Sequence, residues 1–118
     1  MTNQFKKKHS FEDRKAESKK ILEKYPERIP IIVTKDPKSQ LSDMDKNKFL
    51  TPCELTLGQF LFLIRKRINI DESTSLFIFV QETILAPTSF TMQSLYDSYK
   101  DEDGFLYLMY CSENVFGK

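Results

Sequence analysis

The sequence is poor in the residues on which most catalytic and metal sites depend. It has one histidine, two cysteines, three glycines and no tryptophan among its 118 residues. His9 stands among lysines, without an acidic or cysteine neighbour, so a surface residue is a better interpretation than a catalytic base. There is no glycine-rich loop that could cradle a phosphate. The residues therefore offer no nucleophile–base pair, and we predict that the protein is not an enzyme.

Metal binding and disulfides are also disfavoured. Cys53 and Cys111 lie far apart in the sequence with no paired spacing, which fits neither a disulfide framework nor a zinc site and suits a reducing compartment such as the cytosol. The consecutive carboxylates Asp101, Glu102 and Asp103 lack the glycine and ligand spacing of a calcium loop, so a solvated turn is expected there. We expect no metal and no dissociable cofactor.

Long apolar runs and a strong net charge are absent as well. No run approaches the roughly 20 residues of a membrane span, and none follows a basic start as in a signal peptide. Charged residues make up 30% of the chain, but the net charge is only +1, so no nucleic-acid partner is expected. Basic residues do crowd the first 20 positions. They could bind acidic partners or anionic membrane, although a solvated helix face is the commoner explanation.

The sequence does carry a globular pattern, with 40% hydrophobic residues, ten phenylalanines and five tyrosines. Ser10 is a good N-cap for a helix that Pro26 ends. Thr56 and Gln59 form a capping box, followed by apolar residues at helical spacing up to Ile68. Further segments read as strands over 28–35, 48–52, 76–80 and 105–111, a short helix over 92–99 and a helical turn within 3–9.

This order predicts an α+β fold of the ubiquitin-like β-grasp type, a four-stranded mixed sheet around one long helix. The N-terminal helices are expected on the other side of the sheet from that helix. We divide the chain into an N-terminal helical extension (1–27), the β-grasp domain (28–111) and a flexible C-terminal tail (112–118). Pro30 cannot donate to a sheet ladder, so its end of the first strand should be an edge or a bulge.

The strand 48–52 is predicted to lie near an edge of the sheet, where extended peptides can add. Apolar residues that one core does not obviously need surround it, and basic residues rim it. Two explanations stay open for these apolar residues: they close the seam between the helices and the sheet, or they form two pockets for an acidic-aromatic peptide. The residues concerned are Ile21, Pro30, Ile32, Phe49, Leu50, Phe62 and Leu63, with Arg28, Lys46, Lys48 and Arg67 at the rim.

Seven segments, in this order, carry a resemblance to a known family: FEDRKAESKKI, RIPIIV, DKNKFLTP, LTLGQFLFLIRKRI, LFIFV, YKDEDGFLYLMY and SENVFGK. Together they resemble the ubiquitin-like modifiers of autophagy, which include the yeast founding member and the GABA-receptor-associated-protein branch. The resemblance covers residues 5–118 almost without gaps.

The resemblance implies processing and conjugation at the C-terminus. A cysteine protease would use Phe116 as an anchor and cut after Gly117, which removes Lys118. An E1-like and then an E2-like enzyme would pass the Gly117 carboxylate to the amine of phosphatidylethanolamine, a covalent modification. The protein would then be found in the cytoplasm and, when lipidated, on the phagophore or autophagosome membrane and in the vacuole or lysosome.

The resemblance also implies docking of cargo receptors and autophagy machinery that carry an aromatic-x-x-aliphatic motif. The first pocket, for the aromatic residue, would consist of Glu17, Ile21, Pro30, Ile32, Lys48, Leu50 and Phe105. The second pocket, for the aliphatic residue, would consist of Phe49, Pro52, Leu55, Phe60, Leu63 and Ile64. Arg28, Lys46 and Arg67 would meet acidic flanks, and Phe77, Ile78 and Phe79 would form a surface for helical motifs, unless they are simply a buried strand.

One position departs from the family pattern, because Thr51 stands where the family usually has valine, which would make the second pocket more polar. An alternative function also remains open from the sequence. The chain could be a β-grasp interaction module that is never conjugated, acting in trafficking or on microtubules.

Overall fold

The computed structural model describes residues 4–112. Within them the helices are α1 (Gln4–Lys8), α2 (Phe11–Lys24), α3 (Leu57–Ile68) and α4 (Met92–Tyr99). The strands are β1 (Arg28–Lys35), β2 (Lys48–Pro52), β3 (Phe77–Val80), β4 (Ile84–Leu85) and β5 (Leu106–Cys111). None of the described helices is long and apolar enough to cross a membrane.

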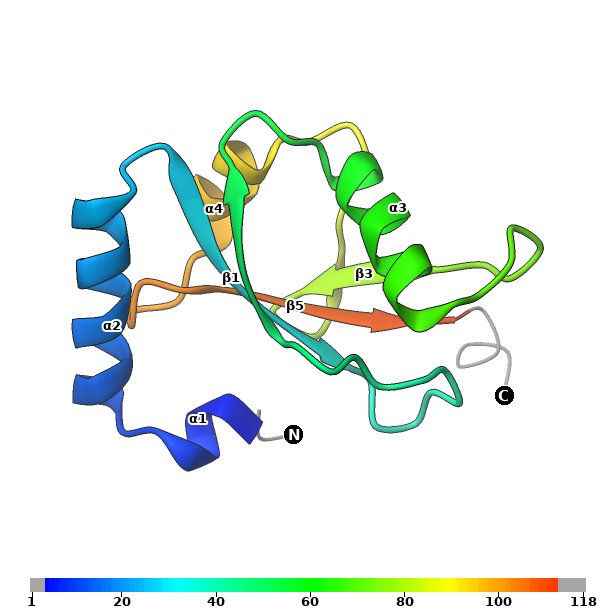
Figure 1. The fold of residues 1–118 in the computed structure, drawn as a ribbon, viewed down its shortest axis with the longest axis horizontal. Coiled ribbons are helices and arrows are strands. Elements are labelled where there is room, and N and C mark those ends of the chain that lie inside the picture. Colours follow the sequence, from blue (N-terminus) through cyan, green and yellow to red (C-terminus); the bar gives the residue numbers. More distant parts are fainter. Residues whose placement is uncertain (1–3, 113–118) are drawn as a thin grey trace.

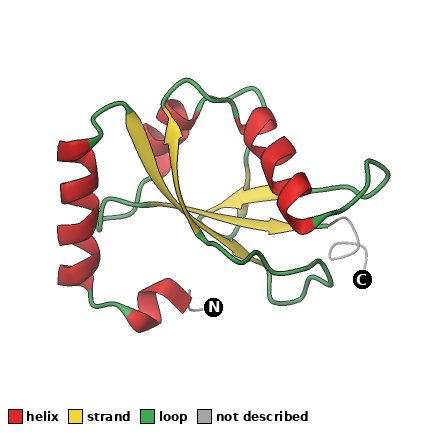
Figure 2. Cartoon of the chain, viewed as in Figure 1, coloured by secondary structure: helices red, strands yellow, loops and turns green. Residues whose placement is uncertain are grey.

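The strands form one mixed sheet in the order β2-β1-β5-β3-β4 (Figure 1). β1 and β5 run parallel at its centre, and the other neighbouring pairs are antiparallel. The helix α3 lies across one face, while α1 and α2 lie on the opposite side of the sheet (Figure 2). This is the predicted β-grasp arrangement, and the predicted fold class is confirmed. The two-residue strand β4 is an addition to the four predicted strands, since two residues are too few to show an alternating pattern.

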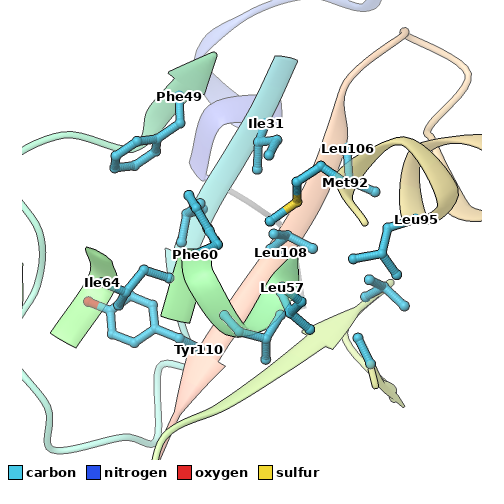
Figure 3. Close-up of a cluster of buried hydrophobic side chains, with 14 of the residues drawn as sticks. Ile31, Phe49, Leu57, Phe60, Ile64, Met92, Leu95, Leu106, Leu108 and Tyr110 are labelled. Atoms are coloured by element: carbon cyan, nitrogen blue, oxygen red, sulfur yellow. The ribbon is translucent and has the colours of Figure 1, made fainter. Parts of the chain in front are cut away.

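The main core lies between the sheet and α3. Thr56 and Gln59 form the predicted capping box at the start of α3, and Asn69 ends the helix in a left-handed conformation. Leu57, Phe60, Ile64 and Ile68 are buried on one face of the helix, as their spacing predicts. They pack on inward-facing residues of the strands, among them Ile31, Leu108 and Tyr110 (Figure 3).

A second, smaller core lies on the opposite face of the sheet, beneath the N-terminal helices. Phe5 of α1 packs against Phe105, with the ring centroids 5.3 Å apart in an edge-to-face arrangement. Ile32 is buried in the same cluster, and Ile21 and Tyr107 pack against it. The N-terminal helices are therefore part of the packed body of the protein.

Two acidic residues of the loop before β5 anchor these helices. Lys6 of α1 pairs with Asp101 at 2.7 Å, and Arg14 of α2 pairs with Asp103 at 2.6 Å. Asp103 is fully buried and Asp101 is partly buried, whereas only Glu102 is exposed. The expectation of a solvated acidic turn is thus wrong for Asp103, because its partner on α2 is remote in sequence.

Pro30, which has no backbone N–H, lies inside β1 at a position where the sheet does not require one. The pairing of β1 with β5 begins only at Ile31, opposite Leu106. Towards β2, Pro30 faces Leu50, and hydrogen-bonded pairs of an antiparallel ladder alternate with pairs that share no hydrogen bond. Since the N–H of Val33 donates to the carbonyl of Asn47, the Pro30–Leu50 pair is one without hydrogen bonds. This end of β1 is therefore an edge towards β5, as the proline predicts.

Candidate functional site

The free edge of β2 is the centre of the candidate site. β2 is the outermost strand of the sheet, hydrogen-bonded to β1 alone among the described strands. In the register of the two strands, Phe49 lies in a hydrogen-bonded pair with Ile31. The backbone groups of Lys48 and Leu50 consequently point away from β1, and the Arg28 guanidinium already donates to the Leu50 carbonyl at 3.4 Å. This edge can accept one more extended strand.

The residues predicted for the first pocket come together on the α2 side of β2. The cross-strand pairs Pro30–Leu50 and Ile32–Lys48 place these four side chains on one face of the sheet. From α2, the Glu17 carboxylate forms an ion pair with the Lys48 ammonium. Ile21 packs on the buried pair Ile32 and Phe105, which form the floor of this region.

Phe5 also belongs to this region, although sequence reasoning missed it. Its ring lies on Phe105, and the Lys48 ammonium is 5.6 Å from its centroid. Phe5 is only 5% exposed. An aromatic residue next to a lysine run was the signal available, but nothing local in the sequence shows which side of the sheet such a residue covers.

Most of the residues predicted for the second pocket lie on the other face of β2, beside α3. The Phe49 and Phe60 rings pack edge to face with centroids 5.6 Å apart (Figure 3). Phe60 and Ile64 are fully buried and so form a floor, whereas Leu63 is 45% exposed. Leu55 and Leu63 line a shallow hollow together with Thr56, Gly58, Gln59 and Phe62. Pro52 is exposed at the end of β2, where strand alternation places it on the same face as Leu50, apart from Phe49.

Basic side chains stand at both ends of the edge strand. The charged groups of Lys46 and Arg67 lie 5.1 Å and 5.3 Å from the Phe49 ring centroid, and Arg67 also pairs with Asp45 at 3.7 Å. Arg28 is exposed and lies opposite Pro52, at the other end of β2. A cation on each side allows acidic residues before or after a docked segment to be neutralised.

The predicted helical-motif surface is only partly available. Ile78 points into the main core and is 1% exposed, so it does not belong to any surface. Phe77 and Phe79 point to the opposite face of β3 and are partly exposed. The reason is the two-residue period of a strand, which sends neighbouring side chains to opposite faces. Phe116, Gly117 and Lys118, predicted for cleavage and conjugation, lie outside the described residues.

Two features of residues 4–112 bear on metal binding and thiol chemistry. In residues 4–112 no three His, Cys, Asp or Glu side chains are grouped so that they could hold a metal ion. Cys53 and Cys111 are free thiols there. Burial, and then the nearby charge of Asp36, raises the pKa of Cys111 to about 11, so this thiol stays protonated at neutral pH.

The mixed sheet grasping α3, with parallel central strands, defines a ubiquitin-like protein. Residues 13–117 match the family model described as "Autophagy protein Atg8 ubiquitin like". The chain is 50% identical to Autophagy-related protein 8 of Gibberella zeae over 118 residues, which are 100% of this chain and 99% of that protein. It is also 50% identical to Autophagy-related protein 8 of Aspergillus niger over 117 residues, 99% and 98% of the two chains.

A solved structure agrees with these sequence relatives. The crystal structure of Trypanosoma brucei ATG8 superimposes with a TM-score of 0.89 at 40% sequence identity, covering 96% of this chain and 97% of that one. The chain therefore belongs to the Atg8 family of ubiquitin-like autophagy proteins.

Proposed function

We propose that this chain is a modifier that becomes attached to autophagic membranes through its C-terminus. A cysteine protease cuts after Gly117, and E1-like and E2-like enzymes then join the new carboxylate to phosphatidylethanolamine. The family match, which runs as far as residue 117, supports this assignment. Glycine suits the reaction because it has no side chain to obstruct a narrow thioester-forming channel. The two acyl chains of the phospholipid are sufficient for stable anchoring.

The conjugated protein then recruits receptors and autophagy machinery through the β2 edge. The observation that carries this proposal is that residues predicted for the two pockets, such as Leu50 and Phe49, lie on opposite faces of the sheet, one beside α2 and one beside α3. In an extended segment, residues three positions apart point to opposite faces. An aromatic-x-x-aliphatic motif paired with Lys48–Leu50 would thus present its aromatic side chain to the first pocket and its aliphatic side chain to the second.

Conjugation is tested by intact-mass spectrometry of the protein from starved cells, separated into membrane and soluble fractions. We expect a membrane-bound species without Lys118 that carries phosphatidylethanolamine on Gly117. Gly117→Ala should remain unlipidated and still bind peptides. Uniform retention of Lys118 on a soluble protein would instead favour a non-conjugated interaction module in the cytoplasm.

Docking is tested with a fluorescent acidic peptide that contains Trp-x-x-Leu. Leu50→Ala in the first pocket and Leu63→Ala in the second should each weaken binding by about tenfold, since both side chains reach the surface. Leu85→Ala is the matched control, because Leu85 is 54% exposed on the opposite edge of the sheet. Equal losses in all three variants would contradict docking at β2.

A further inference from the structure

Thr51 has an unsatisfied hydroxyl inside the candidate site. The residue is 4% exposed, and its Oγ1 has no hydrogen-bond partner; no other buried side-chain nitrogen or oxygen in residues 4–112 shares this condition. Buried polar groups are nearly always hydrogen-bonded, because an unpaired one loses the hydrogen bonds that water would otherwise make with it, and this loss costs free energy. A valine would fill the same space without that cost, so core packing alone does not account for the hydroxyl.

The position of Thr51 connects this hydroxyl to the second pocket. Thr51 lies opposite Ile29 in the β2–β1 register and two residues after Phe49. Ile29 and Phe49 both belong to the main core, so the Thr51 side chain points to the same, α3-facing side of β2. Pro52 follows it directly and Leu55 is four residues on. The Thr51 side chain therefore lies on the face of β2 that carries Phe49, the face to which the second pocket is assigned.

The Thr51 hydroxyl lies behind the hollow that Leu55 and Leu63 line, among buried side chains of the second pocket. Phe60 and Ile64 are fully buried, and Phe49 is only 9% exposed. Leu63, at 45% exposure, is the most exposed of the predicted pocket residues on α3. A side chain that enters between Phe49 and Leu63 would bring its own atoms to Thr51.

We propose that Thr51 determines specificity in the second pocket, and that its hydroxyl favours a motif whose aliphatic position carries both a methyl group and a hydroxyl, namely threonine, over the isosteric valine. This proposal rests on the proposed docking function. An entering valine leaves the Thr51 hydroxyl unpaired, whereas an entering threonine can donate to it or accept from it. A site whose buried polar group needs a partner discriminates against the analogue that lacks one.

The test is a double-mutant cycle. It combines the exchange of threonine for valine at position 51 of the protein with the same exchange at the aliphatic position of the peptide. Trp-x-x-Leu, Trp-x-x-Val and Trp-x-x-Thr peptides with identical acidic flanks are titrated against the unaltered protein, Thr51→Val and Thr51→Ser. We expect the ratio of the threonine-peptide to the valine-peptide affinity to be about 3–10 times higher for the unaltered protein than for Thr51→Val, the contribution of one hydrogen bond. Thr51→Ser should keep the high ratio, because it keeps the hydroxyl.

Thermal unfolding provides a second readout that needs no peptide. Thr51→Val should raise Tm by about 2–4 °C, because it removes an unsatisfied polar atom and leaves the shape unchanged. Equal threonine-to-valine ratios in the unaltered protein and Thr51→Val, with normal Leu-peptide binding, would overturn the role of Thr51 and leave the docking function standing. A Leu peptide that binds none of the three proteins would overturn both.

Discussion

Arg14 and Asp103, 89 positions apart in the sequence, form an ion pair of 2.6 Å in the interior of the protein. The Asp103 carboxylate also accepts from the Tyr107 hydroxyl at 2.5 Å and from the Phe105 N–H at 2.9 Å. Ser18 adds a hydrogen bond from α2 to the Asp103 carbonyl at 2.5 Å. One carboxylate thereby joins α2 to the start of β5, next to the Phe105 floor of the first pocket.

Removing the negative charge of Asp103 should destabilise the fold strongly. Asp103→Asn keeps the shape of the side chain but leaves the Arg14 guanidinium without its counter-ion in a buried site. We expect a loss of about 3 kcal/mol in the free energy of unfolding, measured in urea. Glu102→Gln is the control, because the neighbouring Glu102 is exposed and should change stability by no more than about 0.5 kcal/mol. A loss below about 1 kcal/mol in Asp103→Asn would show that the pair does not hold α2 in place.

Gly104, next to Asp103, should not tolerate a side chain. Its φ is +93°, and an added Cβ would lie 2.2 Å from Ser18 Oγ and 3.0 Å from Ser18 Cβ. Both the backbone strain and the overlap with α2 oppose alanine, so Gly104→Ala should cost about 3 kcal/mol of unfolding free energy. Hydrogen exchange should also show weakened protection of α2.

Gly58 provides the control for the Gly104 experiment. It lies in α3, and a Cβ there would come no closer than 3.4 Å to the Thr88 carbonyl oxygen. Alanine favours helix more than glycine does, so Gly58→Ala should leave stability unchanged or raise it by up to about 1 kcal/mol. If both glycine variants lost stability equally, the contact with Ser18 would not be the cause.

Substitutions in the turn between β3 and β4 should stabilise the protein. Gln81 and Glu82 have φ values of 53° and 67°, and the Thr83 N–H donates to the Val80 carbonyl at 3.3 Å. Two successive positive φ values are the geometry of a tight hairpin turn that favours Asn-Gly. The double change Gln81→Asn, Glu82→Gly should therefore add about 1 kcal/mol and raise Tm by about 4 °C.

Alanine at the same two positions separates backbone strain from loss of the original side chains. Gln81→Ala, Glu82→Ala keeps a Cβ at both positive-φ positions, so it should give no gain. Equal stabilisation by both double variants would mean that the side chains, rather than the backbone, had been unfavourable.

How far the sequence predicted this structure depends on how local each determinant is. The Thr56–Gln59 capping box and the helical apolar spacing after it lie within a few turns, and they predicted α3 correctly. Strand alternation predicted that Phe49 and Leu50 point to opposite faces of β2, as they do, whereas the full sets of pocket residues came from the family resemblance. Phe5 on Phe105 and Arg14 on Asp103 depend on partners about 90–100 residues away. No local pattern encodes them, so they were missed.

Alkaline pH should destabilise the protein, because two buried side chains hold their protons more tightly in the folded state than in the unfolded state. Burial raises the pKa of Tyr110 from 10.0 to about 12, with a further contribution from the charge of Asp43, and the pKa of Cys111 from 9.0 to about 11. Above pH 9 the unfolded chain releases these protons first, so the free energy of unfolding falls as pH rises. Well below pH 9 both groups are protonated in both states and contribute no pH dependence.

Tyr110→Phe isolates the contribution of Tyr110 to the loss of unfolding free energy at alkaline pH. The Tyr110 hydroxyl donates to the Ser42 carbonyl at 2.6 Å, so its removal should cost about 1 kcal/mol at pH 7. Between pH 10 and 12, however, the variant should lose less stability than the unaltered protein, because it has no phenol to ionise in the unfolded state. Urea unfolding at pH 7, 9, 10 and 11 measures both effects, since the two stability curves should converge as pH rises. Curves that stay parallel above pH 10 would mean that the buried Tyr110 hydroxyl is not the retained proton, and that Cys111 and Tyr107, whose pKa burial also raises, account for the alkaline loss.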